Sequence, residues 1–142
     1  MFRKLDDRFY VAAQILPEDL ADAAALGVRR VVNNRPDGEE PGQPEGALIA
    51  GAAAQAGLDY CAIPVTHAGF SHAQVDAMTA ALAEPDGAVL AFCRSGTRST
   101  FLWALARAKS GAAPDALTEQ AASAGYDLNP IRPMLDALSA RP

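Results

Sequence analysis

The segment GAVLAFC, residues 87–93, is the part of the sequence that most restricts the fold. It is an almost unbroken apolar run, which is typical of a strand buried on both faces of a parallel sheet. A short polar loop follows, and then STFLWALARAKSG (99–111), which starts with Ser99 and is apolar almost all round for two turns. This order predicts a central strand, a loop and a buried helix, as in an α/β domain.

The rest of the chain alternates in the same way between β-rich and alanine-rich segments. We predict strands at 8–15, 28–34, 58–65 and 87–93, and helices at 16–27, 47–57, 71–84, 99–111, 113–127 and 129–140. Residues 35–46 are dense in Pro, Gly and acidic residues and are predicted to form an unusually long loop. We therefore expect a single domain, 1–142, with a three-layer α/β fold: a mainly parallel sheet of four to five strands flanked by helices.

Charge and hydropathy exclude some classes of function. The net charge of −5 argues against a broad nucleic-acid-binding surface, which needs a basic face, so any anion site must be local. No apolar run approaches the roughly 18 residues that a membrane-spanning helix needs. The N-terminal segment has basic residues but not the apolar core of a secretion signal after them, because Asp6, Asp7 and Arg8 interrupt it. We expect a cytoplasmic protein that binds neither nucleic acid nor membranes.

The two cysteines, Cys61 and Cys93, need separate interpretations. Two cysteines do not make a disulfide framework for a chain of this length, and neither belongs to a pair spaced like zinc ligands. The sequence therefore predicts no metal site and no other cofactor.

The loop CRSGTRS, residues 93–99, joins a thiol to many hydrogen-bond donors. It follows the carboxyl end of the predicted central strand, where parallel sheets place their sites. The amides from Arg94 to Arg98 can point inward if the loop curls at Gly96, and so bind an anion. The following helix adds the positive end of its dipole, and the forked guanidinium of Arg98 can hold two oxygens.

The same donors would act on the sulfur of Cys93. A free thiol has a pKa near 8.5, and amides, a helix N-terminus and arginines can lower it to about 3.5–7.5. Cys93 is then a thiolate nucleophile at neutral pH, with fixed donors for the charge on the transferred group. Two simpler interpretations stay open: Cys93 is a buried core cysteine, or the loop is a non-catalytic anion-binding module.

The cysteine loop resembles those of two groups of enzymes. Protein tyrosine and dual-specificity phosphatases place five residues between their cysteine and arginine, usually with a histidine before the cysteine. This chain has four residues there, and Phe92 before Cys93. Single-domain rhodaneses carry a very similar loop, but the aspartate-arginine turn and glycine-histidine segment that usually precede it are not found in this sequence.

Three segments together resemble the beta-lactamase hydrolase-like family, also called DUF442. They are VVNNRPDGEE (31–40), IPVTHAGF (63–70) and FCRSGTRS (92–99), in this order and spacing. The resemblance implies a fold like that of protein tyrosine and dual-specificity phosphatases with a shortened loop, in a family whose members are described as phosphatases or sulfur transferases. Some members are fused to a persulfide dioxygenase domain, which makes such an enzyme a candidate partner.

Sulfur transfer is the chemistry that the sequence favours. The loop is one residue shorter than in the phosphatases, so its ring of backbone amides is narrower. A narrower ring should suit a small sulfur-borne group better than a phosphate. The segment after Val65 also lacks the aspartate that phosphatases use as general acid. We expect a rhodanese-type sulfurtransferase, in which Cys93 takes sulfane sulfur from thiosulfate or a persulfide and passes it to a thiol or cyanide. The alternative is a cysteine-dependent phosphatase that forms phosphocysteine from a phosphoester.

Within the loop, Cys93 and Arg98 are the predicted catalytic pair. The predicted anion-binding or substrate-binding positions are Arg94, Ser95, Gly96, Thr97 and Ser99. Arg94 either recruits anionic substrates or is a surface side chain without a role. Ser99 either binds the Cys93 sulfur, as the resemblance to phosphatases implies, or caps the helix.

Three further residues are candidates at the same edge of the sheet. His67 is the one residue there suited to act as acid or base, unless it is simply polar surface. Asn34 and Arg35 end another predicted strand, and the resemblance implies that Arg35 orders the long loop or meets substrate. The alternative is that the acidic residues of the loop are solvated and that Arg35 pairs with them.

Overall fold

The computed structural model describes residues 1–83 and 86–140, which form a five-stranded sheet between two layers of helices. The strands are β1 (Arg3–Asp6), β2 (Phe9–Ala12), β3 (Val28–Asn33), β4 (Asp59–Ala62) and β5 (Ala88–Phe92), in the order β1-β2-β5-β3-β4. All neighbours are parallel except β1 and β2, which form an antiparallel hairpin. The predicted α/β class and mainly parallel sheet are confirmed.

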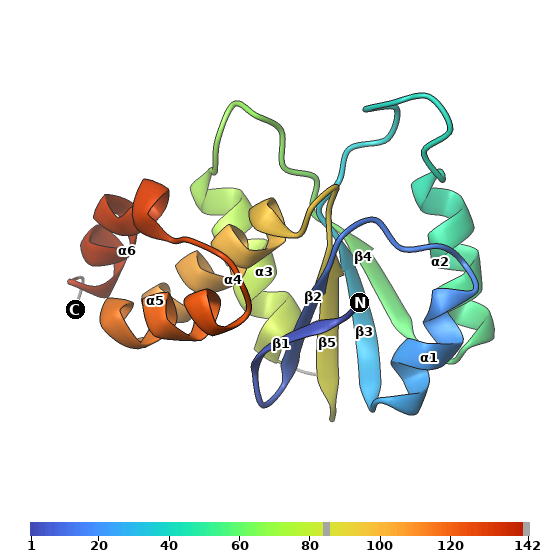
Figure 1. Ribbon diagram of the computed structural model, residues 1–142, viewed down its shortest axis with the longest axis horizontal. Coiled ribbons are helices and arrows are strands. Elements are labelled where there is room, and N and C mark those ends of the chain that lie inside the picture. Colours follow the sequence, from blue (N-terminus) through green and yellow to red (C-terminus); the bar gives the residue numbers. More distant parts are fainter. Residues whose placement is uncertain (84–85, 141–142) are drawn as a thin grey trace.

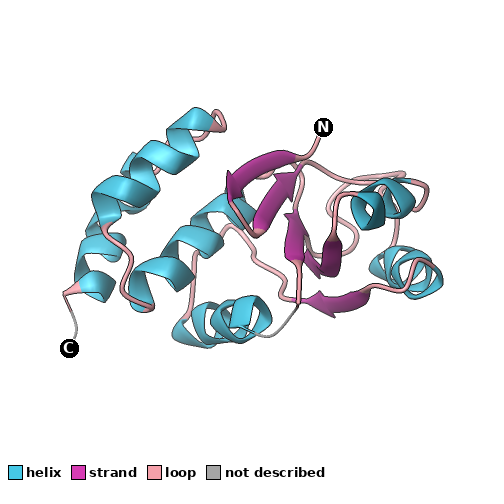
Figure 2. Ribbon diagram, turned by 90° about the horizontal axis from the view of Figure 1, so that it is seen from below, coloured by secondary structure: helices cyan, strands magenta, loops and turns pink. Residues whose placement is uncertain are grey.

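The helices divide between the two faces of the sheet. They are α1 (Asp19–Ala25), α2 (Gly46–Gln55), α3 (His72–Ala83), α4 (Thr97–Lys109), α5 (Pro114–Ser123) and α6 (Arg132–Ser139), with a short 3-10 helix at Asn129–Ile131. Figure 1 shows α1 and α2 on one face and α3 to α6 on the other, and Figure 2 shows the sheet between these layers from below. Each face has its own apolar core.

Strand β5 is central, as its apolar sequence predicted. All five of its residues are buried, and β2 and β3 flank it. The register aligns Phe92, its last residue, with Ala12 of β2 and Asn33 of β3. The chain segments that follow these three strands therefore meet at one edge of the sheet, which is the upper edge in Figure 1.

The structure corrects two predictions of elements. The first concerns β1, which was not predicted because its sequence, RKLD, points only Leu5 into the core and is otherwise charged, as edge strands often are. The second concerns α4, which begins at Thr97 with Gly96 as its N-cap, two residues before the predicted start. Ser99 therefore lies inside the first turn and does not cap the helix.

None of the helices in the described parts of the chain is long and apolar enough to cross a membrane.

Candidate active site

The cysteine loop connects the end of β5 to the start of α4. Gly96 takes a left-handed conformation, with φ of 92°, that an L side chain rarely adopts, and this turns the chain into the helix. The Gly96 amide then donates a hydrogen bond to the Cys93 sulfur at 3.1 Å. Cys93 itself is 0% exposed. Its sulfur thus lies at the base of the loop, next to a helix N-terminus, and is out of contact with solvent in this conformation.

Arg98 reaches from the first turn of α4 across the edge of the sheet. Its Nη1 donates to the carbonyl of Val65 at 2.7 Å, which ties the segment after β4 to the loop. Both terminal nitrogens donate to the carboxylate of Glu39, at 2.7 and 2.8 Å. The bonds to Glu39 raise the pKa of Arg98, and the neighbouring Cys93 adds to this increase. Arg98, next to the Cys93 thiol, thus binds the carboxylate of Glu39 through both terminal nitrogens.

Glu39 is held from two sides. Arg35 donates to the same carboxylate at 2.9 Å, to Glu40 at 2.9 Å and to Gln14 at 3.0 Å, and is itself only 3% exposed. The pKa of Glu39 is lowered to about 2, chiefly by its hydrogen bonds with Arg98, and Arg35 adds to the effect. Glu39 is therefore a partly exposed anion held between two guanidinium groups. From the sequence it was only one of several acidic residues in a long loop.

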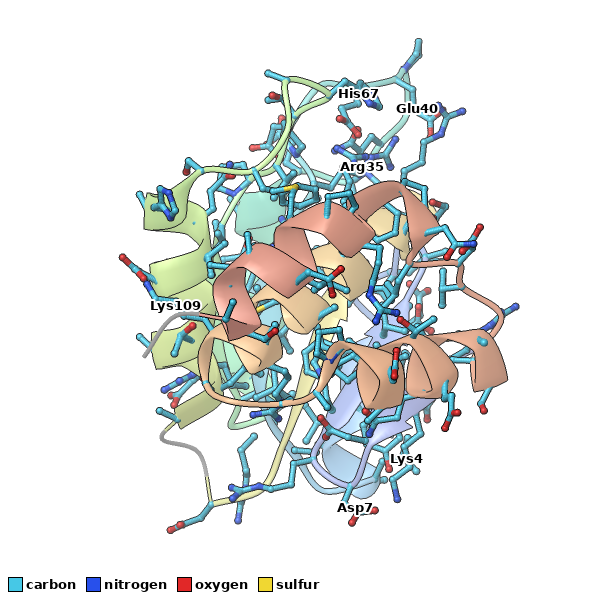
Figure 3. The ribbon with its side chains drawn as sticks, turned by 90° about the vertical axis from the view of Figure 1, so that its left-hand side faces the viewer. Lys4, Asp7, Arg35, Glu40, His67 and Lys109 are labelled. Atoms are coloured by element: carbon cyan, nitrogen blue, oxygen red, sulfur yellow. The ribbon has the colours of Figure 1, made fainter. Side chains whose placement is uncertain are left out.

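Glu40 extends this network to the surface. It pairs with Arg35 and lies 3.5 Å from Arg94, and these two arginines lower its pKa, Arg35 the more strongly. The loop after β3 therefore folds over the active edge, with two glutamates set among three arginines. Arg35 pairs with both of these glutamates. Figure 3 shows Arg35, Glu40 and His67 at the same end of the molecule, opposite Asp7.

The other predicted residues differ in their positions. Arg94 is largely exposed, and the hydroxyls of Ser95 and Thr97 bond to each other at the surface of the loop. Asn34 is buried and donates to the carbonyl of Ile63, so it joins the ends of β3 and β4. The hydroxyl of Ser99 is buried without a hydrogen-bond partner among the described residues.

His67 lies in the exposed turn between β4 and α3. Its segment is tied to the site through Val65, whose carbonyl accepts from Arg98. Within the described residues, no three His, Cys, Asp or Glu side chains are grouped as metal ligands would be. The groups that lie at this edge are a thiol, three arginines, backbone amides, two glutamates and His67.

The family follows from a comparison of the whole sequence. A family model described as "Beta-lactamase hydrolase-like protein, phosphatase-like domain" matches residues 1–110. The chain belongs to this family. The resemblance inferred from the three segments is thereby confirmed. Helices α5 and α6 lie beyond the residues that the beta-lactamase hydrolase-like model matches.

Relatives in the family are longer proteins. A beta-lactamase hydrolase-like protein of Agrobacterium fabrum is 38% identical over 108 residues, which are 76% of this chain and 25% of the relative. One from Xylella fastidiosa is 36% identical over 107 residues, or 75% of this chain and 25% of the relative. The chain thus spans about a quarter of the length of these curated relatives.

Solved structures extend the comparison to phosphatases. A candidate phosphatase from Neisseria meningitidis is 34% identical, has a TM-score of 0.83 and is matched over 96% of both chains. The active form of Tk-PTP, at 19% identity and a TM-score of 0.76 over 99% of this chain and 97% of its own, shares the fold. So does TpbA of P. aeruginosa, solved with pTyr, at 21% identity and a TM-score of 0.67 over 97% and 87%.

These comparisons confirm the predicted phosphatase-like fold, and they support the prediction of an enzyme that uses a cysteine nucleophile. They support the phosphatase alternative over sulfur transfer, which was the chemistry that the sequence favoured. The preference for sulfur transfer rested on the four residues between Cys93 and Arg98 and on the lack of an aspartate after Val65.

Proposed function

We propose that the protein is a cysteine-dependent phosphatase that hydrolyses phosphate monoesters. The observation that carries the proposal is the Cys93 sulfur, which accepts the Gly96 amide beside Arg98 in a phosphatase-like fold. The thiolate attacks phosphorus, and the bond from phosphorus to the ester oxygen breaks, so the leaving group departs with the electron pair. Water then attacks the phosphocysteine, which releases inorganic phosphate and restores the thiolate.

In this proposal the substrate replaces Glu39 on Arg98. The two oxygens of the carboxylate take both ends of the guanidinium fork, which is the grip that two phosphate oxygens would need. Arg35 stays bonded to Glu39 and Glu40 and can retain the loop when Arg98 is released. Binding of a phosphate ester is thus an exchange of one anion for another on the same arginine.

The substrates should be esters with good leaving groups. The segment 63–71 after β4 contains no carboxylic acid, and His67 is its one titratable side chain. Glu39 has a pKa of about 2, so it is ionised at neutral pH and cannot supply a proton. A phenol, with a pKa near 10, leaves as an anion far more readily than an alkyl alcohol. We therefore expect aryl phosphates to be hydrolysed faster than alkyl phosphates.

Sulfur transfer through a Cys93 persulfide is the second candidate, because only four residues separate Cys93 from Arg98. The donor would be thiosulfate or a persulfide, the acceptor a thiol or cyanide, and a persulfide dioxygenase would be a fitting partner. This activity would require the same thiolate but no acid for an oxygen leaving group.

Intact-mass measurement separates the two candidates. The protein is treated with an aryl phosphate or with thiosulfate and quenched in acid, with Cys93→Ser as control. A phosphoryl adduct and released phosphate, both absent from the control, are expected. A gain of one sulfur atom with no phosphate release would reject the phosphatase in favour of the sulfurtransferase.

A further inference from the structure

Tyr126 is a residue outside the family match that contacts the cysteine loop. It lies between α5 and the 3-10 helix at Asn129–Ile131, beyond the matched residues 1–110. Its hydroxyl donates to the carbonyl of Ser95 at 3.1 Å. The ring also covers Gly96 closely, since a Cβ added to that glycine would lie 2.2 Å from the Tyr126 oxygen. The C-terminal helices thus bring a side chain to the outer side of the loop.

The contact controls the direction of one peptide group. In a trans peptide, the carbonyl of Ser95 and the amide of Gly96 point in opposite directions. Tyr126 engages the carbonyl from outside, and the amide faces inward to the Cys93 sulfur at 3.1 Å. If the peptide flipped, the carbonyl oxygen would face the sulfur, and the two electron-rich atoms would repel. The outer bond therefore favours the orientation that stabilises a thiolate.

The loop itself provides little resistance to such a flip. A flip changes ψ of Ser95 and φ of Gly96, and glycine accepts positive and negative φ about equally. Ser95 is exposed, and its hydroxyl bonds to Thr97 rather than to a distant element. A group outside the loop is needed to hold the Ser95–Gly96 peptide in one orientation. The Tyr126 hydroxyl can do so, because it donates to the Ser95 carbonyl.

Tyr126 is held in turn by two elements. Its amide bonds to the carbonyl of Ala121 at the end of α5, after Gly125 has turned the chain with φ of 93°. The Arg3 guanidinium lies 5.6 Å from the ring centroid and donates to the carbonyl of Ala124 at 2.7 Å. Strand β1 and helix α5 thus fix the ring over the loop.

We propose that Tyr126 is a positioning residue for the nucleophile. Its hydroxyl holds the Ser95–Gly96 peptide so that the Gly96 amide donates to the Cys93 sulfur. The inference rests on Cys93 being the nucleophile of the proposed function. It does not depend on whether phosphate or sulfur is transferred.

The test is Tyr126→Phe, which removes the hydroxyl and keeps the ring. The matched control is Tyr10→Phe on β2, whose side chain packs with the core on the α1–α2 face of the sheet. The rate of alkylation by iodoacetamide is measured against pH, and peptide mass spectrometry resolves Cys93 from Cys61. The readout is the midpoint of this profile, which a general change in access to the sulfur does not alter.

We expect Tyr126→Phe to move the midpoint of the Cys93 alkylation profile upward by about 0.5–1 pH unit, because the thiolate loses part of a charge-assisted hydrogen bond. Activity toward an aryl phosphate should fall about three- to tenfold below this midpoint and recover at higher pH. A purely structural role would lower the melting temperature without moving the midpoint.

An unchanged midpoint, equal to that of Tyr10→Phe, would overturn the proposal even if the phosphatase is active. A raised midpoint in a protein without phosphatase activity would support the role of Tyr126 and reject the proposed reaction, because alkylation needs no substrate. The two failures are therefore distinguishable.

Discussion

Replacement of Glu39 by glutamine tests whether this carboxylate competes with substrate. The amide has nearly the same shape as the carboxylate but cannot neutralise Arg98. The pKa of Glu39 falls from 4.5 to about 2, and each unit is worth about 1.36 kcal/mol, so roughly 3 kcal/mol is an upper bound for the stabilisation of the ionised form, because solvent screens this partly exposed group. Arg98 supplies the largest part of this stabilisation. A substrate that takes the place of Glu39 on Arg98 has to offset the loss of that part.

If solvent screening and the share of Arg35 leave about half of this upper bound to Arg98, Glu39→Gln should lower KM for an aryl phosphate by about tenfold. The inhibition constant of inorganic phosphate should fall by a similar factor, because phosphate meets the same arginine. Both constants are measured by steady-state kinetics at pH 7. Glu40→Gln is the matched control, because it changes the net charge equally but removes a partner of Arg35 and Arg94 only.

A different outcome would refute this reasoning. If Glu39→Gln leaves KM unchanged or raises it while kcat falls, the carboxylate orients Arg98 for catalysis and does not compete with substrate. If Glu40→Gln lowers KM as much as Glu39→Gln, the effect comes from the general field of the protein and not from the Arg98 fork.

Three further predictions follow from the same network. Arg98→Lys should lower kcat/KM about 100-fold, because lysine cannot form the paired bonds of the guanidinium; a loss below about threefold would contradict the bidentate role. His67→Ala should lower kcat more for an alkyl phosphate than for an aryl phosphate, and equal losses would remove His67 from proton transfer. The contribution of Glu39 to the unfolding free energy should be fully present above about pH 4.5 and be lost towards pH 2, because its lowered pKa makes the unfolded chain bind more protons in that range. Urea titrations of the wild type and Glu39→Gln at pH 6 and at about pH 3 should show a smaller loss in the variant, and parallel losses would count against the effect.

The sequence predicted the parts of the fold that depend on local patterns. The apolar run of β5 identified the central strand, and the alternation of strands and helices identified the class. Strand β1 was missed because hydrogen bonding to β2, rather than its own charged sequence, makes it a strand. The predicted start of α4 was two residues too late. The prediction relied on the preference of Ser99 for helix starts, whereas the backbone conformation of Gly96 ends the loop and begins the helix.

The site was predictable only where its residues are close in sequence. Cys93 and Arg98 stand in one short loop, so their proximity follows from the motif. Arg98 meets Glu39 across 59 positions, and Tyr126 meets Ser95 across 31. No local pattern encodes such contacts, because they depend on how a long loop and a C-terminal connection pack on the finished sheet.

The complete burial of Cys93 also affects how long the enzyme survives oxidants. Peroxide must touch a thiolate to convert it to sulfenic acid, and a low-pKa thiolate in contact with solvent is the form most easily lost. Peroxide can reach the Cys93 sulfur only if the chain around it opens locally. The frequency of that opening then limits the rate of oxidation. A resting molecule of this kind should keep its nucleophile reduced in conditions that would inactivate an open site.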